Sequence, residues 1–413
     1  MKLCREFRLW KLILLLVFVV IFLQIFHMSL LSKLESKETE DFSQINKVLL
    51  EIESKVRKPH KLDKSGTYNV IPNVIQASRR PTMNSENLTI ITQCTSNHLH
   101  HLVELTEFFQ GPVSVAVFTY VNDVQNAVRS IAYYHFCNKF IRQFVTFHMV
   151  YPTDTPPINN PSWDVTFDCD TPPTNTNNAN YAIEGIEYPH NLLRNLALKY
   201  SRTSHIFLID IDMIPSRNLK EVFLKNQKNY FLKKTTFISR SAHVVPAFEL
   251  KNGYEVPKNR MELIDMWEKN IIRPFYEEVC WKCQKYTDYD KWRASESELT
   301  SAYHVDFHDP WEPYYIAAKS IPLYDERFKQ YGFNRISQIC EMHIAGYQFS
   351  VLTDVFLVHK GFKHTQEFHK TKNDELDKNR ILFRKFKNEL KTKYKESDVK
   401  SHFISQSNKE RKY

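Results

Sequence analysis

Two aspartates at positions i and i+2 follow a short apolar run and are the residues best suited to chemistry in this 413-residue chain. Asp210 and Asp212 come directly after residues 206–209, a run typical of a strand that is covered on both faces. In extended backbone, side chains at positions i and i+2 point to the same face, so both carboxylates can reach one cation. Two adjacent carboxylates repel each other unless a cation neutralises them, and oxygen ligands suit Mg²⁺ or Mn²⁺. The spacing therefore predicts a metal site at the end of a strand, where open α/β sheets bind their ligands.

Two other interpretations of the acid pair stay open. One acid could cap a turn while the other is solvated, although the preceding apolar run and Pro215 favour a metal site. Haloacid-dehalogenase phosphatases also place two aspartates after an apolar strand. Their pattern has Thr or Val where this chain has Ile214, so this alternative is the weaker one.

A second group of polar residues follows another largely apolar run, residues 351–358. The imidazole of His359 can complete the inner shell of a metal, and Lys360 and Lys363 can hold a diphosphate. Gly361 suits a close approach of the backbone to a ligand. The alternative is that His359 is only a surface residue, and the acid pair favours the ligand.

Composition and charge exclude several classes of protein. The chain has only 7 glycines, and neither GxGxxG nor GxxxxGK[ST] occurs, so a Rossmann dinucleotide site and a P-loop are excluded. The formal charge of +9 would be compatible with a nucleic-acid partner. However, residues 1–11 carry a net +3 and residues 360–413 a net +8, which leaves about −2 for residues 12–359. We therefore expect no nucleic-acid partner.

Alternating strand and helix patterns must position these residues. Residues 113–118 and 144–150 are β-branched and aromatic runs of strand length, and residues 124–136 between them have helical spacing. Residues 189–200 predict a helix with proline near its first turn. Residues 374–394 predict a surface helix with one apolar side. Strands that alternate with helices predict an α/β sheet.

The N-terminal segment predicts a membrane anchor. The apolar residues 12–31 are numerous enough to cross a hydrocarbon core of about 30 Å. The basic residues in segment 1–11 place that end in the cytoplasm, and a cleaved signal peptide would be shorter and end in a small-x-small site. We therefore expect a single-pass type II protein with a lumenal stem over residues 32–70, a catalytic domain over 71–395 and a basic tail over 396–413.

Cysteine usage and a glycosylation sequon agree with a lumenal body. Six cysteines would lie on the oxidising side of the anchor, an even number that suits disulfide pairing. Cys280, Cys283, Cys340 and His343 also have the CxxC…CxxH spacing of a zinc site, but an oxidising lumen favours disulfides. Asn87 begins an Asn-Leu-Thr sequon, which is used only in the secretory pathway. A cluster of histidines is interpreted as a solvated turn: His98, His100 and His101.

Six longer segments resemble glycosyltransferase family 49. In chain order they are YPHNLLRN (188–195), FLIDIDMIPS (207–216), VVPAFE (244–249), DPWEP (309–313), DERFKQYGFNR (325–335) and LVHKGFK (357–363). The resemblance covers roughly residues 70–390 and implies a GT-A fold, which is a Rossmann-like mixed sheet with flanking helices. It also implies a nucleotide-sugar donor and Mn²⁺ bound by Asp210 and Asp212. The chain is too short for the members of the family that carry two catalytic domains.

The same resemblance implies a reaction. It indicates UDP-glucuronate as donor and a xylose-terminated acceptor on O-mannosyl glycans such as those of dystroglycan, joined in β-1,4 linkage. An α-linked donor that gives a β-linked product requires a single displacement with a general base on the acceptor hydroxyl. We take Asp309 and Glu312 as candidates for this base, because they flank Trp311, an aromatic residue suited to stacking on a sugar. An ion pair of Glu312 with an arginine is the alternative. Arg194 or Arg335 could bind the donor carboxylate, since a guanidinium matches a carboxylate bidentately.

Three functions remain open on the sequence. The leading one is a glucuronyltransferase of the Golgi membrane, alone, as a homodimer or in a complex with other Golgi transferases. The second is the same fold with another UDP-sugar, such as UDP-N-acetylglucosamine. The third is a catalytically silent scaffold for another transferase, and the intact Asp210, Asp212, His359 and Lys363 argue against it.

Overall fold

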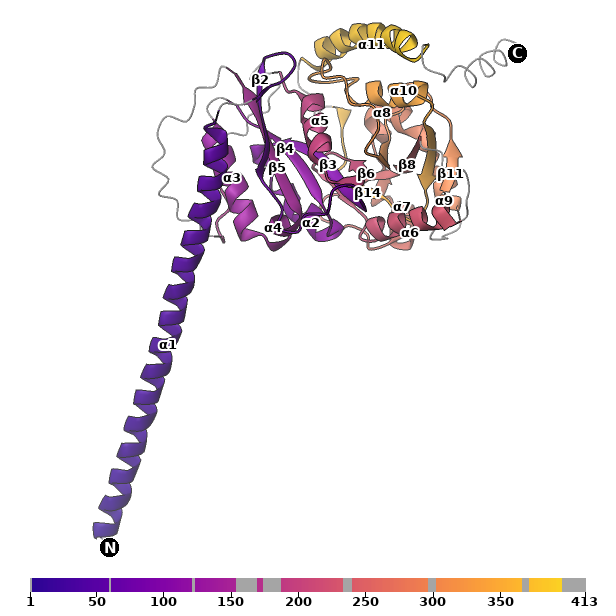
Figure 1. Cartoon of the computed structure of the whole chain (residues 1–413). Helices are drawn as coiled ribbons and strands as arrows, with labels where there is room; N and C mark the ends of the chain where they lie inside the picture. Colours follow the sequence, from indigo (N-terminus) through magenta and orange to yellow (C-terminus); the bar gives the residue numbers. More distant parts are fainter. Residues whose placement is uncertain are drawn as a thin grey trace.

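Two sheets and the helices packed on them make up the body of the protein (Figure 1). The larger sheet has the strand order β1-β2-β5-β4-β3-β6-β12-β8-β13-β11, and the smaller has the order β10-β9-β14-β7. A computed structural model describes these parts of the chain: residues 2–58, 61–120, 123–153, 169–173, 187–232, 240–295, 302–365 and 371–395.

The larger sheet is mixed. Strand β3 runs parallel to both β4 and β6, and β4 runs parallel to β5, whereas β12 pairs antiparallel with β6 and β8. Its strands are β1 (Lys61–Leu62), β2 (Tyr68–Ile75), β3 (Ser85–Thr95), β4 (Val113–Phe118), β5 (Val145–Pro152), β6 (Thr203–Leu208), β8 (Ser241–Val245), β11 (Ala302–Val305), β12 (Tyr314–Ala318) and β13 (Gln348–Leu352). The smaller sheet contains β7 (Met213–Pro215), β9 (Ala247–Leu250), β10 (Ile272–Pro274) and β14 (Leu357–Lys360).

Helices cover both faces of the larger sheet, and its central strands are therefore buried on both sides. Every residue of β4 is buried; Val113, Val115 and Val117 belong to one apolar cluster, and Ala116 and Phe118 belong to another. The helices are α1 (Lys2–Val56), α2 (His101–Phe109), α3 (Val124–Cys137), α4 (Lys139–Phe144), α5 (His190–Tyr200), α6 (Leu219–Leu232), α7 (Arg260–Glu268), α8 (Glu277–Gln284), α9 (Tyr289–Ala294), α10 (Ile336–Ile344) and α11 (Lys372–Lys395). The predicted α/β architecture is confirmed, and the strands and helices predicted from pattern differ from the observed ones by a few residues at their ends.

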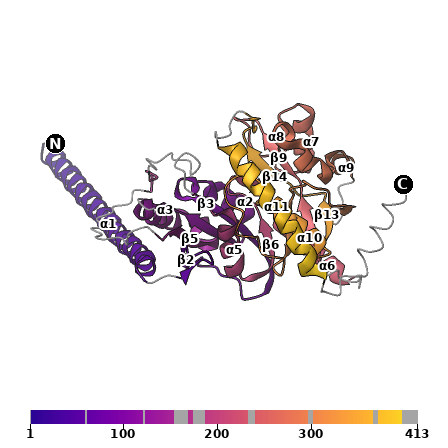
Figure 2. The ribbon, with the colours of Figure 1, turned by 90° about the horizontal axis from the view of Figure 1, so that it is seen from above.

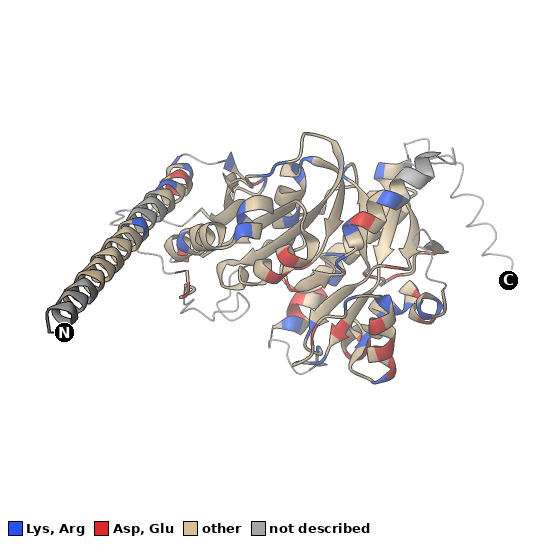
Figure 3. Ribbon diagram, turned by 90° about the horizontal axis from the view of Figure 1, so that it is seen from below, with Lys and Arg blue, Asp and Glu red and all other residues tan. Residues whose placement is uncertain are grey.

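Helix α1 is one long helix that extends away from the body (Figures 1 and 2). Its segment Leu14–Lys33 is long and apolar enough to cross a membrane and is not buried against the protein. Figure 3 shows this stretch without acidic residues, whereas both charge signs are interspersed on the helices of the body. The C-terminal part of α1 packs on α3 and β2 through four buried side chains: Ile45, Leu49, Ile52 and Val56. The segment expected to be a stem therefore contributes to the core.

The cysteine pairing differs from the expectation that all six lumenal cysteines pair. Disulfides join Cys137 to Cys169 and Cys280 to Cys283, whereas Cys94 and Cys340 are free and buried. The prediction of complete pairing is therefore wrong. A zinc site on the CxxC segment is excluded as well, because its two sulfur atoms are bonded to each other.

Candidate active site

The acid pair lies where the chain leaves the larger sheet and enters the smaller one. Asp210 and Asp212 follow the carboxyl end of β6, and the N–H of Met213 donates to the carbonyl oxygen of Asp210 at 3.1 Å to close the turn. Both carboxylates line a cavity of about 1140 Å³. This volume is slightly above the roughly 300–1,000 Å³ that is typical of small-molecule sites. The acid pair thus lies at a strand end and lines a ligand-sized cavity, and its binding of a metal stays a prediction.

Two arginines and a tyrosine surround Asp210. Arg194 Nη2 lies 3.3 Å from Asp210 Oδ1, and Arg335 Nη1 lies 3.2 Å from Oδ2. The hydroxyl of Tyr314 donates to Oδ2 at 2.8 Å. Burial alone would raise the pKa of Asp210, but the positive charges of Arg335 and Arg194 lower it below its ordinary value. Asp210 is therefore a fixed anion.

Asp212 faces a histidine and a lysine. Its Oδ2 lies 3.1 Å from His359 Nε2 and 3.6 Å from Lys363 Nζ. Burial again opposes ionisation, but the hydrogen bond and charge of His359 and the charge of Lys363 hold the pKa of Asp212 well below its usual range. The two predicted site segments, 207–216 and 357–363, are brought together here because β7 and β14 pair antiparallel, with His359 opposite Met213.

The surroundings of His359 fit a divalent cation. Nδ1 lies 2.8 Å from the carbonyl oxygen of Gly361, and Nε2 lies 3.1 Å from a carboxylate oxygen, so both ring nitrogens face acceptors. A neutral imidazole has only one N–H to donate. When Nε2 gives up its proton and Nδ1–H stays on the carbonyl, as metal-ligating histidines are usually held, the Nε2 lone pair becomes available for a cation shared with Asp212. Within the described ranges no three His, Cys, Asp or Glu side chains already converge on one point, and Asp210 is turned toward its arginines.

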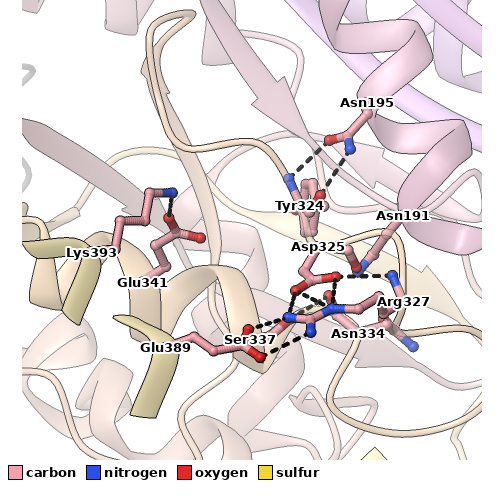
Figure 4. Close-up of polar contacts among 10 residues, drawn as sticks. All are labelled: Asn191, Asn195, Tyr324, Asp325, Arg327, Asn334, Ser337, Glu341, Glu389 and Lys393. Atoms are coloured by element: carbon pink, nitrogen blue, oxygen red, sulfur yellow. Dashed lines mark hydrogen bonds and ion pairs between the residues drawn. The ribbon is translucent and has the colours of Figure 1, made fainter. Parts of the chain in front are cut away.

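Hydrogen bonds from helix α5 hold the loop that leads to Arg335. Asn191 Nδ2 donates to the carbonyl of Asp325 at 2.8 Å, and Asn195 exchanges two hydrogen bonds of 2.9 Å with the backbone of Tyr324 (Figure 4). Arg327 bridges Asp325 to a glutamate of α11. Residues at i and i+4 lie on the same side of a helix, which is why these two asparagines reach one loop. The hydrogen bonds of α5 therefore bring the two predicted segments, 188–195 and 325–335, together.

Arg194 and Arg335 are both in the site, but both guanidinium groups are aimed at Asp210. Arg194 also donates to the side-chain oxygen of Asn334 at 2.9 Å. The guanidinium of Arg335 lies over the ring of Tyr314, 3.9 Å from its centroid, and donates to the carbonyl of Glu312 at 3.2 Å. In the observed geometry, both arginines hold the carboxylate of Asp210 in place. Their contact with a donor carboxylate stays a prediction.

Of the two candidate bases, Glu312 is the one that faces the charged centre. Its backbone is fixed, because its N–H donates to the carbonyl of Cys283 at 2.8 Å and its carbonyl accepts from Gln284 Nε2 at 3.1 Å. Burial raises the pKa of Glu312, and the nearby Arg335 opposes this only in part. In the described part of the chain, no hydrogen bond or ion pair engages its carboxylate. Asp309 also lines the cavity but pairs with Lys387 of α11 at 3.3 Å.

Trp311, expected to stack on a sugar, has a structural role instead. Its side chain is fully buried, Nε1 donates to Thr287 Oγ1 at 3.1 Å, and the ring packs edge-on against Phe349. The stacking prediction is therefore wrong, because a sugar cannot reach a ring that the core covers.

Lys360 is not brought to the acid pair. Successive residues of a strand point to opposite faces, so Lys360 points away from the face of its neighbour His359. Its Nζ lies 2.6 and 2.7 Å from the two carboxylate oxygens of Glu104 on α2. The predicted contact of Lys360 with a diphosphate has no support in this geometry, whereas Lys363 lines the cavity.

The sequon lies within a strand. Asn87 is half-buried in β3, and the hydroxyl of Thr89 is buried and bonds to that of Thr203 at 2.7 Å. Glycosylation of Asn87 stays a prediction.

Sequence reasoning missed the histidine cluster as a part of this site. His98 lines the cavity, and the rings of His98 and His101 stack with centroids 6.0 Å apart. Burial lowers the pKa of His101 to about 4, and the negative charge of Asp212 opposes this shift. The clustering of three histidines at positions 98, 100 and 101 could have indicated a role in the site. However, their proximity to Asp212 depends on how the strands pair in the sheet and not on their spacing in the sequence.

Solved structures match this chain only distantly. The structure described as "Crystal structure of S. aureus TarS 1-349 in complex with UDP-GlcNAc" matches with a TM-score of 0.37 and 10% sequence identity. The match covers 76% of this chain and 68% of that one.

Two curated relatives of the same name match over most of their length. Beta-1,4-glucuronyltransferase 1 of Danio rerio is 37% identical over 95% of this chain and 98% of its own. The Homo sapiens protein of the same name is 38% identical over 81% and 82%. Xylosyl- and glucuronyltransferase LARGE1 of Homo sapiens is more distant, at 28% identity over 75% of this chain and 35% of its own. The family described as "Glycosyl-transferase for dystroglycan" matches residues 87–395. With this match and relatives at 37–38% identity, the chain belongs to glycosyltransferase family 49.

Proposed function

We propose that this chain is a metal-dependent, inverting glucuronyltransferase of the Golgi membrane. It transfers glucuronic acid from UDP-glucuronate in β-1,4 linkage to a xylose-terminated O-mannosyl glycan of the dystroglycan type. The observation that carries the proposal is one cavity lined by the ionised acid pair, Lys363 and Glu312, with His359 against Asp212. The names of the relatives support the transferred sugar and the linkage.

On the donor side, the chain's own residues would hold the metal and the diphosphate. Asp212 and His359 provide the carboxylate oxygen and imidazole nitrogen that suit Mn²⁺, and Asp210 provides a second carboxylate nearby. A bound Mn²⁺ would supply the positive charge that stabilises the leaving diphosphate. Lys363 adds a positively charged ammonium group on the same side. Arg335 is the better placed of the two arginines to meet the uronate, because its side chain is 12% exposed against 7% for Arg194.

On the acceptor side, Glu312 takes the proton of the attacking hydroxyl. The 4-hydroxyl oxygen of the xylose forms a bond to C1 of the glucuronate as the bond from C1 to the diphosphate oxygen breaks. Attack from the face opposite UDP converts the α-linked donor into a β-linked product. A base works best when its pKa lies near the working pH, and burial moves the pKa of Glu312 in that direction.

The N-terminal helix and the disulfides support the proposed compartment. The segment Leu14–Lys33, flanked on its N-terminal side by basic residues, would anchor the protein with residues 1–11 in the cytoplasm. The pairs Cys137–Cys169 and Cys280–Cys283 suit an oxidising lumen. We propose the Golgi as the membrane, since the proposed acceptor is a glycan of the secretory pathway.

A donor panel tests this function. Full-length protein in detergent, with Mn²⁺ and an aryl β-xyloside as acceptor, is incubated separately with UDP-glucuronate, UDP-N-acetylglucosamine and UDP-glucose, and UDP release is measured. We expect acceptor-dependent release from UDP-glucuronate. Release from UDP-N-acetylglucosamine alone would support the alternative donor, and no release with any sugar would contradict an enzymatic role.

A further inference from the structure

A row of paired residues in the smaller sheet connects the strand of His359 to a buried ion pair. His359 on β14 is the register partner of Glu249 on β9, and Glu249 is the register partner of Arg273 on β10. Directly paired residues point to the same face of a sheet. Glu249 and Arg273 therefore lie on the face of the smaller sheet that also carries His359.

Glu249 is fully buried and is satisfied by three donors. Arg273 Nε donates to Oε2 at 2.9 Å, the N–H of Tyr276 donates to Oε1 at 2.9 Å, and the N–H of Lys363 donates to Oε2 at 3.2 Å. A buried charge is tolerated only when it is paired and hydrogen-bonded, so these contacts define where the three donors can lie.

Arg273 contacts the other side of the same peptide segment. Its Nη2 donates to the carbonyl oxygen of Lys363 at 3.0 Å, and the ring of Phe362 covers the guanidinium at 4.2 Å. The N–H of Lys363 goes to Glu249 and its carbonyl to Arg273, so the ion pair fixes both backbone polar groups of this lysine.

The fixed backbone determines where the ammonium group of Lys363 lies. The chain turns at Gly361, where φ is +89°, a conformation that side-chain-bearing residues rarely adopt. Beyond this turn, Lys363 Nζ lies 3.6 Å from Asp212 and faces the cavity. We propose that Glu249 and Arg273 are positioning residues for Lys363, which place its ammonium group against the diphosphate of the nucleotide donor. This inference rests on the proposed function and names a device within that same site.

A double-mutant cycle with UDP as the probe tests the inference. Full-length protein in detergent is titrated with UDP in the presence of Mn²⁺ by calorimetry. We expect Lys363→Met to weaken UDP binding about tenfold, the effect of losing one charge-assisted contact. Glu249→Gln should also weaken binding about tenfold in the wild-type background, but less than twofold when Lys363→Met is already present. Effects that fail to add identify two residues that act through one contact.

Glu278→Gln is the matched control. Glu278 also pairs with Arg273, at 3.4 Å, and with His364, at 3.0 Å, but it is exposed and does not contact the backbone of Lys363. The same chemical change should leave UDP affinity within about twofold, as expected for an exposed ion pair. Thermal unfolding of every variant accompanies the titrations. If Glu249→Gln does not fold, Arg273→Lys replaces it in the cycle. Lysine keeps the positive charge but lacks the guanidinium geometry that contacts both Glu249 and the carbonyl of Lys363.

Two results would overturn the inference. Equal losses from Glu249→Gln in both backgrounds would show general damage to the site, and an unchanged affinity would show that the pair does not position Lys363. These outcomes differ from failure of the proposed function, in which the wild-type protein itself would bind no UDP with Mn²⁺.

Discussion

Replacement of Glu312 by glutamine removes the proposed base and keeps the shape of the side chain. The backbone of Glu312 is held by Cys283 and Gln284, and in the described structure its carboxylate has no hydrogen-bond partner to lose. The exchange should therefore leave the fold and the donor side intact. General-base catalysis contributes about 10²- to 10⁴-fold, so we expect kcat to fall by that factor. This loss corresponds to about 2.7–5.4 kcal/mol at 1.36 kcal/mol per tenfold change in rate.

The assay is glucuronyl transfer to a xyloside over a range of pH, with UDP binding measured in parallel. For the wild type, the rate should be high where Glu312 is ionised and fall as the pH drops through its pKa. Burial raises that pKa, so the fall should begin at a higher pH than for an ordinary glutamate. In Glu312→Gln this limb should disappear.

Asp309→Asn is the comparison, because Asp309 lies in the same segment and pairs with Lys387 instead. We expect it to change kcat by less than about threefold, as for a partly exposed ion pair. If Glu312→Gln keeps most of the wild-type kcat while UDP binding is intact, or if Asp309→Asn carries the large loss, the assignment of the base is wrong.

Three further predictions follow from the same structure. Asp212→Asn should weaken the Mn²⁺-dependent binding of UDP at least about 100-fold, since loss of a ligand should exceed the 10- to 100-fold cost of altering its outer-shell partners; calorimetry measures this, and equal binding with and without Mn²⁺ would contradict it. A soluble form that begins at residue 65 should be far less stable than one that begins at residue 40, because it lacks four buried side chains of α1 worth about 1.5–3 kcal/mol each; equal melting temperatures would refute this packing. Trp311→Ala should lower stability by about 3–5 kcal/mol in denaturant unfolding but leave the KM for the acceptor of the folded protein unchanged; a raised KM with normal stability would restore a sugar contact.

The elements that hold the acid pair were predictable because their patterns are local. The apolar run before Asp210 falls largely in strand β6, and the helix predicted over residues 189–200 is α5. The pairing of Asp212 with His359 could be anticipated from the kind of residue but not from distance along the chain, since it depends on the antiparallel register of β7 and β14. That register is set by the fold as a whole.

The errors arose where neighbours in sequence point in different directions. Trp311 and Glu312 are adjacent, yet the first fills the core and the second lines the cavity. Lys360 follows His359 in a strand and so points to the opposite face.

The stem looked like a spacer because its apolar residues are sparse. However, Ile45 and three other apolar residues, at spacings of three and four, form one buried stripe on a helix.

The product of the reaction tests the central claim most directly. Proton NMR of the disaccharide formed from UDP-glucuronate and an aryl β-xyloside identifies the anomer and the position of the new linkage. We predict a β-1,4-linked glucuronyl-xyloside that forms with Mn²⁺, is lost on its chelation, and is absent with Asp212→Asn. An α-linked product, or undiminished transfer by Asp212→Asn, would contradict a metal-assisted inverting transfer at this site.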